Sequence, residues 1–498
     1  MKRSVVPYLV DHQLIIETHA KAFGLDFYQT LYEVLDYRRM NEVAAFGGFP
    51  VRYPHWRFGM DYERLLKSHT YGLSHIYEMV INNDPCYAYL LEGNSIVDQK
   101  LVMCHVLGHN DFFKNNYCFG PTNRKMVDEM ANHATRIRRY ADRFGVDLVE
   151  QFIDICLSIE NLVDPLGQYI RRSPEAEAEP GLDEERLPGA RHRISTATPY
   201  MEDYVNPPEF LKNQELRRAE EQERRKKFPP EPDRDVYRFV MRHAPLTRWQ
   251  RGVMEIILSE AEYYIPQRMT KIMNEGWATY WHSKLMTERV LDASELVDYA
   301  KVSAGVTASP PGHFNPYKMG LELFRHIEER WNKGQFGKEW VDCDDLAVKE
   351  SWDRGTGLGR MKIFEVRKHY HDVTFVSEFF TEDFCRRHMY YTFGFNNRRD
   401  RWEIESRAFQ TIKERLISSL VNSGNPVILV EDANYQNRGE LLLRHRHEGV
   451  DLRKDYAQEV LLNLYKLWTR PVHILTKTGE RQTIVGYDGS EHVEKSVA

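Results

Sequence analysis

Residues 271–282, KIMNEGWATYWH, constrain the fold more than any other stretch of this 498-residue chain. Read as a helix, the segment is apolar on nearly every side, with Trp277 and Trp281 away from the face that carries Glu275 and His282. Glu275 and His282 are seven residues apart, which is two helical turns, so they share one face. A helix that is apolar all round is usually buried, and an unpaired charge is costly to bury. The acid and the imidazole therefore predict a polar cluster inside a helical core.

Length, charge and hydropathy narrow the class of protein. A chain of 498 residues exceeds one ordinary core, so two domains are expected. The formal net charge of −6 gives no electrostatic case for nucleic-acid binding. No run of eighteen apolar residues predicts a membrane span, and the first residues do not resemble a secretory signal. The six cysteines lack CxxC or zinc-finger spacing, which favours reduced, packed thiols in a cytoplasmic protein.

The spacing of apolar residues predicts a mostly α fold. Helical spacing dominates from the N-terminus, including a helix over 74–83, and predicts a large multi-helix domain at 1–385. Within it, the charged, Pro-rich segment 172–196 reads as a mobile, variable insertion. From about residue 386 the pattern changes to alternation, with segments in β-α-β-β-α-β order. This order predicts a small α+β domain at 386–490.

A pair of histidines supplies the strongest chemical signal. His105 and His109, in CHVLGHNDFF, lie one helical turn apart. Zinc hydrolases hold their metal with two histidines at this spacing and a carboxylate from another helix. Glu275, in the Asn274-Glu275-Gly276 sequence, is the candidate third ligand. The spacing is thus compatible with a divalent metal, zinc, bound by His105, His109 and Glu275.

The pattern departs from that of the zinc proteases at the general base. Their motif is HExxH, whereas position 106 here is Val. A hydrolase of this kind would need a base from elsewhere, for which Glu78 and Glu260 are candidates, and His282 could stabilise an oxyanion.

Two other interpretations use the same residues without zinc. A purely structural core network would pair Glu275 with His105 or His109, and Glu78 with His282. A ferritin-like di-iron bundle would need a Glu three residues before a His, which none of the twenty histidines has. The core network therefore stays open and the di-iron bundle is disfavoured.

Several long, irregular motifs carry a family resemblance. MVINNDP, CHVLGHNDFFKNN, PPEFL, PQRMTKIMNEGWATYWHS and KLWTRPVHILT resemble the SpoVR (stage V sporulation protein R) family. The resemblance runs from about residue 8 to about residue 490. It implies a bacterial protein linked, in spore formers, to formation of the spore cortex, a specialised peptidoglycan layer. It also implies relatives in bacteria that never sporulate, often encoded near a serine protein kinase.

The resemblance and the polar cluster together lead to two functional hypotheses. The first is a peptidoglycan hydrolase, most simply an amidase, acting on peptidoglycan or its precursors in the cytoplasm of the mother cell. The second is a non-enzymatic regulatory or scaffold protein that works with a serine protein kinase. The sequence leaves open whether the chain forms a homo-oligomer.

Overall fold

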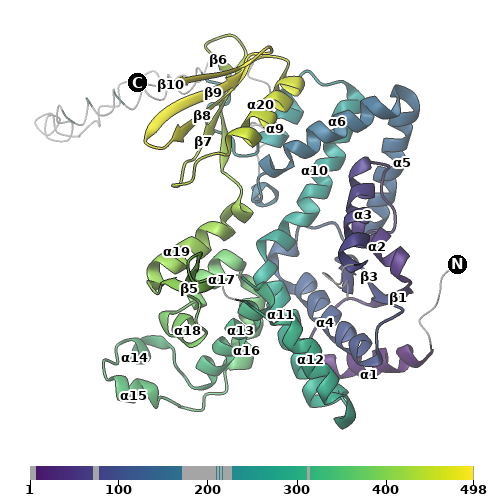
Figure 1. The fold of residues 1–498 in the computed structure, drawn as a ribbon, viewed down its shortest axis with the longest axis vertical. Helices are drawn as coiled ribbons and strands as arrows, with labels where there is room; N and C mark the ends of the chain where they lie inside the picture. Colours follow the sequence, from purple (N-terminus) through teal and green to yellow (C-terminus); the bar gives the residue numbers. More distant parts are fainter. Residues whose placement is uncertain are drawn as a thin grey trace, which may run out of the picture. The chain divides into compact units, whose positions relative to one another are not determined.

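The computed structural model describes residues 7–70, 78–170, 227–310 and 314–496, together with positions 209, 212 and 216 (Figure 1). The predicted insertion at 172–196 lies outside the described residues.

Contacts between Cα atoms divide the chain into two units, each built from two stretches of sequence. The first unit comprises Met1–Glu150 and Glu262–Asn425, and the second comprises Gln151–Ala261 and Pro426–Ala498. The chain passes between the units three times: within α6 (Val146–Ser158), within α10 (Arg248–Met269), and between Asn425 and Pro426.

Helices make up most of the first unit, as predicted. Their bounds are α1 (Pro7–Ala22), α2 (Tyr37–Ala45), α3 (Trp56–Thr70), α4 (Ile96–Asn115), α5 (Met126–Phe144), α11 (Lys271–Leu285), α12 (Leu296–Val306), α13 (Pro316–Asn332), α14 (Gly337–Val341), α15 (Leu346–Glu350), α16 (Gly359–His369), α17 (Asp372–Phe379), α18 (Glu382–Arg387) and α19 (Phe409–Leu420).

The centre of this unit is helix α11, which packs between α4 and α13. Figure 1 shows these three helices near the middle of the first unit. Trp277 and Trp281 of α11 are fully buried, and the core around them includes side chains of α1, α4, α13, α16 and α17. The prediction that the apolar segment is a buried central helix is confirmed.

A small sheet in the first hundred residues was not predicted. Strands β1 (Thr30–Leu35), β3 (Cys86–Leu91) and β2 (Glu78–Ile81) form it in the order β1-β3-β2, with β1 parallel and β2 antiparallel to β3. The helix predicted over 74–83 is therefore wrong from residue 78 onward. Short apolar segments fit helical and strand periods equally well, and here pairing with the buried β3 selects the strand.

The second unit contains the main sheet, as expected for the C-terminal region. Its strands are β6 (Ile428–Tyr435), β7 (Glu440–His445), β8 (Val472–Thr478), β9 (Arg481–Tyr487) and β10 (His492–Ser496), in the order β10-β9-β8-β7-β6. Within this five-stranded sheet, β7 and β8 are parallel to each other and the other neighbouring strands are antiparallel. Helix α20 (Lys454–Trp468) packs on β8 and β9, and α9 (Val236–His243) contacts β6. The predicted fold class, mostly α with a small C-terminal α+β region, is confirmed.

Two details of the C-terminal prediction differ from the structure. The first predicted strand, β4 (Thr392–Asn396), pairs only with β5 (Arg401–Ser406) in a separate hairpin. The contacts also divide the chain at 425–426 and not at the predicted 385–386. The physical reason is α19, whose side chains Phe409, Ile412 and Leu416 pack against the core of the first unit.

Among the described helices, none combines the length and apolarity needed to cross a bilayer. All six cysteines are free thiols, and five of them are buried. Burial raises the pKa of the Cys104 thiol well above its usual value, which fits a packed side chain and not a nucleophile.

Candidate metal centre

Helix α4 brings His105 and His109 to one face. The helix begins with a capping box, in which the Ser95 hydroxyl accepts the backbone N–H of Asp98 and the Asp98 carboxylate accepts the N–H of Ser95. One turn separates the two imidazoles, and their ring centroids are 4.6 Å apart. Both side chains are buried. The predicted pairing of these histidines on one helical face is present.

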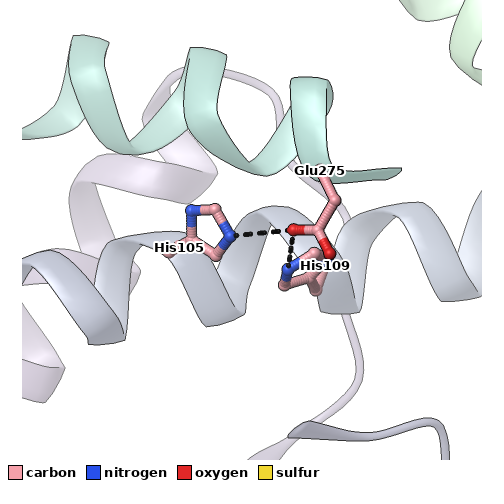
Figure 2. A group of neighbouring side chains, drawn as sticks. All are labelled: His105, His109 and Glu275. Atoms are coloured by element: carbon pink, nitrogen blue, oxygen red, sulfur yellow. Dashed lines mark ion pairs between the residues drawn. The ribbon is translucent and has the colours of Figure 1, made fainter. Parts of the chain in front are cut away.

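Glu275 reaches the two histidines from the neighbouring helix α11 (Figure 2). Its Oε2 atom lies 3.4 Å from Nε2 of His109 and 3.6 Å from Nε2 of His105. One potential ligand atom from each of the three buried residues lies within 4.8 Å of the others. In Figure 2 the carboxylate points toward both rings.

These distances can be compared with the two kinds of contact that the residues could make. An N–H···O hydrogen bond usually spans about 2.7–3.2 Å. Two atoms that bind one tetrahedral zinc at about 2.1 Å are about 3.4 Å apart. The observed 3.4 and 3.6 Å separations are close to the second value.

The outer nitrogens of both rings are held by other side chains. Nδ1 of His109 lies 2.9 Å from Oδ1 of Asn274, and Nδ1 of His105 lies 2.8 Å from Nδ1 of His282. Because an amide oxygen can only accept, His109 donates from Nδ1 to Asn274. Its Nε2 atom can then offer a lone pair to a cation, or carry a proton that Glu275 accepts when no cation is bound. Metal-binding histidines are commonly oriented by a hydrogen bond of this kind.

The contacts of Glu275 favour its ionised form. Burial by itself would raise the pKa of its carboxyl group, but contacts with His105 and His109 and the charge of Lys271 hold the pKa well below its usual value. Lys271 Nζ lies 2.5 Å from Oε1 of Glu275, and the lysine side chain is 57% exposed. One carboxylate oxygen thus contacts a cation at the surface, and the other faces the imidazoles.

Glycines allow the helices to approach closely enough for this cluster to form. A Cβ placed on Gly108 of α4 would lie 2.6 Å from the Cα of Ala278 in α11. A Cβ on Gly276 would lie 2.3 Å from the Cα of Gly320 in α13. Such distances are too short for any side chain, so both helix contacts require glycine. Gly108 lies between the two histidines in sequence and Gly276 follows Glu275 directly, so the contacts fix the separation of the ligands.

A buried aspartate fixes the same two helices. Asp111 of α4 is fully buried and accepts hydrogen bonds of 2.8 Å from Trp277 Nε1, from Arg367 Nη1 and from the backbone N–H of Asp26. Burial raises the pKa of Asp111 to about 6, against the lowering effect of Arg367 and the other donors. Asp111 therefore connects α4, α11 and α16 around the cluster.

The N-terminus of α11 is capped by a residue distant in sequence. The carboxylate of Asp372 accepts the backbone N–H groups of Ile272 and Met273 at 2.8 and 2.9 Å. These are two of the four amide groups that a helix leaves unsatisfied at its start. Burial raises the pKa of Asp372 to about 7 although these bonds and Lys271 lower it.

Comparison with known proteins places this architecture in a family. The profile described as SpoVR like protein matches residues 5–425, and that of the SpoVR-like C-terminal domain matches residues 426–479. The chain belongs to the SpoVR family. The boundary between the two SpoVR matches lies between residues 425 and 426. At the same point the first structural unit ends and the C-terminal stretch of the second unit begins. The family resemblance predicted from sequence motifs is confirmed.

A SpoVR relative is "Uncharacterized protein YcgB" of Escherichia coli (strain K12). It is 29% identical over 489 residues, which cover 91% of this chain and 88% of the relative. No solved structure matches this SpoVR chain.

Three residues of this SpoVR protein were predicted to take part in acid–base or oxyanion chemistry: His282, Glu78 and Glu260. His282 joins the cluster, where it contacts His105 and is buried. The backbone of Glu78 lies in β2, paired with Leu90, and its side chain lies outside the described part of the chain. Glu260 is buried on α10 in the second unit, whereas the three potential ligands belong to the first.

Two further buried histidines of the first unit, His133 and His326, lie outside this group. His133 forms an ion pair of 3.3 Å with Glu129 within α5. Burial lowers the pKa of His326 to about 4, with Arg330 and Arg387 adding to the effect, and its ring packs against Phe384.

Several residues that shape the SpoVR site were missed in the sequence. Asn274 was noticed only as the neighbour of Glu275, and Lys271, Asp111 and Asp372 were not identified. Asp111 had a local signal, because it is a carboxylate inside an apolar helix. Asp372 had none, because its partners lie about 100 residues away.

Proposed function

We propose that this protein is a metal-dependent hydrolase of amide bonds, with His105, His109 and Glu275 as the ligands of a divalent cation, most simply zinc. The observation that carries the proposal is the pair of distances from Glu275 Oε2 to the Nε2 atoms of the histidines, 3.4 and 3.6 Å. Two neutral imidazoles and one carboxylate are a frequent ligand set of catalytic zinc.

His105, His109 and Glu275 would hold the metal, which would supply a Lewis acid to polarise a carbonyl group. Around it, Asn274 and His282 hold the two imidazoles, and Lys271 holds the outer oxygen of Glu275. The contact with His105 favours an orienting role for His282 over the oxyanion-stabilising role that the sequence suggested. Glu78 is retained as a candidate for the general base, and Glu260, in the second unit, stays a prediction from the sequence.

The substrate class rests on the family. The link of SpoVR proteins to the spore cortex supports the amide bonds of peptidoglycan or of its precursors as substrate. A location in the cytoplasm, in the mother cell where the host sporulates, would bring the protein into contact with precursors. A serine protein kinase is the proposed partner for regulation.

A specific observation favours a second candidate, a non-enzymatic regulatory protein. His105, His109, Glu275 and His282 are all buried, and each contacts another polar side chain of the protein. Such a cluster can hold helices together without a cation. The two candidates differ in whether the cluster binds metal.

The test combines metal content and activity in one pair of variants. Glu275→Gln removes the charge of the proposed ligand, and Glu129→Gln is the matched control in a His–Glu pair outside the cluster. We expect wild-type protein and E129Q to retain about one equivalent of metal by mass spectrometry after dialysis, and E275Q to lose it. Cleavage of peptidoglycan fragments should fall about a hundredfold or more in E275Q. Wild-type protein that retains no metal, or a metal-free folded E275Q that is fully active, would refute the proposal.

A further inference from the structure

A second candidate site is a cavity of about 810 Å³ in the first unit. It is lined by side chains of α2, α3, the loop between them and α5, and by none of the residues of the metal cluster. Its volume is within the range of about 300–1,000 Å³ that is typical of small-molecule sites. The lining combines arginines, among them Arg38, Arg52 and Arg138, with aromatic rings such as Phe58.

Arginines outnumber acidic residues in the lining of this cavity, so the sum of the side-chain charges is positive. Four arginines face two acids, Asp36 and Glu42. The Asp36 carboxylate caps α2 by accepting the backbone N–H of Arg39, and Glu42 forms an ion pair with Arg39. Arg38 and Arg138 are exposed, and neither has a carboxylate partner among the residues that the structure describes. These two guanidinium groups are therefore available to an anionic ligand.

A third arginine, Arg52, lies in the wall of the cavity. Arg52 is buried, and its guanidinium carbon lies 4.9 Å from the ring centre of Phe58 and 5.2 Å from that of Tyr53. Arg138 donates a long hydrogen bond of 3.4 Å to the backbone oxygen of Arg52, which ties α5 to this wall. Arg52 therefore helps to hold the aromatic wall and α5 in place around the cavity.

Aromatic rings form the other part of the lining. Phe46 and Phe58 are in edge-to-face contact, with ring centres 5.4 Å apart, and Tyr62 also faces the cavity. Aromatic side chains favour flat, apolar groups, while arginine binds phosphate through paired hydrogen bonds. A ligand that has both a planar ring and phosphate groups would use both features.

We propose that this cavity is a nucleotide-binding site, with the phosphates at Arg38 and Arg138 and the base against the aromatic wall around Phe58. This site is separate from the proposed metal centre and does not depend on it. A nucleotide bound here would give the protein a small-molecule ligand whether or not it is a hydrolase.

The experiment measures binding of ADP, pyrophosphate and adenosine to the full chain by isothermal titration calorimetry. EDTA is present so that no phosphate is held by a metal. We expect ADP to bind saturably, and pyrophosphate and adenosine to bind at least about tenfold more weakly, because each has only one of the two features. The double variant Arg38→Gln/Arg138→Gln should weaken ADP binding by about tenfold or more. Both residues are exposed, so folding should be unchanged.

Two further variants make the result specific. Arg139→Gln is the matched control, because Arg139 is exposed on the same helix as Arg138 but does not line the cavity; ADP affinity should stay within about twofold. Phe58→Leu should weaken ADP binding and leave pyrophosphate binding unchanged. The proposal is overturned if ADP does not saturate the protein at about 1 mM, if pyrophosphate binds as tightly as ADP, or if R139Q loses as much affinity as the double variant.

Discussion

Gly108 of α4 lies against Ala278 of α11 so closely that a Cβ on the glycine would be 2.6 Å from the alanine Cα. The contact is between His105 and His109 on one helix and next to Trp277 on the other. Because backbone meets backbone here, neither helix can yield by moving a side chain. The separation of the histidines from Glu275 thus depends on the absence of a side chain at position 108.

The first prediction concerns this contact. Gly108→Ala should destabilise the protein by about 1–3 kcal/mol, the usual cost of overpacking a core, even though alanine favours helix more than glycine. The control is Gly305→Ala in α12, where a Cβ would meet nothing within 4 Å; it should be neutral or stabilising by up to about 1 kcal/mol. Urea unfolding measures both. Equal stability of G108A and wild type would show that the helices are not packed as described.

The second prediction concerns the metal. If His105, His109 and Glu275 bind zinc in the folded state only, added zinc should raise the melting temperature of the metal-free protein. The shift should be absent in His109→Ala and retained in His133→Ala, which removes a buried histidine outside the cluster. Each variant is compared with its own metal-free form, so its intrinsic stability does not affect the comparison. A zinc-dependent shift that persists in H109A would place the metal elsewhere.

The third prediction concerns Asp111. Asp111→Asn leaves the buried Arg367 without its carboxylate partner, so we expect a loss of about 3–5 kcal/mol in the free energy of unfolding. Asp26→Asn is the control, because Asp26 makes an exposed ion pair with Lys114; it should cost less than about 1 kcal/mol. Chemical denaturation at pH 7.5 separates the two, and a D111N variant as stable as D26N would contradict the assigned role.

The fourth prediction concerns pH and Asp372. The folded-state pKa of Asp372 is raised to about 7, above the usual value of 3.8 expected in the unfolded chain. The folded protein therefore holds this proton more tightly than the unfolded one. The stability linked to it is fully present below about pH 4 and is lost as pH rises to about 7.

Asp372→Asn removes that titration. The stability of wild type relative to D372N should fall between pH 4 and pH 8, by an amount on the order of 4 kcal/mol. Asp298→Asn, at a surface ion pair with Lys301, is the control and should stay within about 1 kcal/mol of wild type at each pH. Unfolding midpoints measured across this range provide the check. A constant difference between wild type and D372N would show that Asp372 has an ordinary pKa in the folded protein.

The sequence by itself determined the features that depend on local spacing. The four-residue interval of His105 and His109 puts both on one face of any helix, and the apolar surroundings of Glu275 require that its helix be buried. The mostly α class and the C-terminal strands follow from the same periodicities. These patterns were sufficient to identify the three residues that the structure brings within 4.8 Å.

Only the tertiary structure decided the rest, because the contacts involved join residues that are distant along the chain. Asp372 caps α11 from about 100 residues away, and Trp277 donates to Asp111 across 166 positions. The strand β2 exists because β3 pairs with it, and α19 belongs to the first unit because its apolar side covers that core. Periodicity shows which face of an element is apolar, but the partner that covers this face is selected by packing in three dimensions.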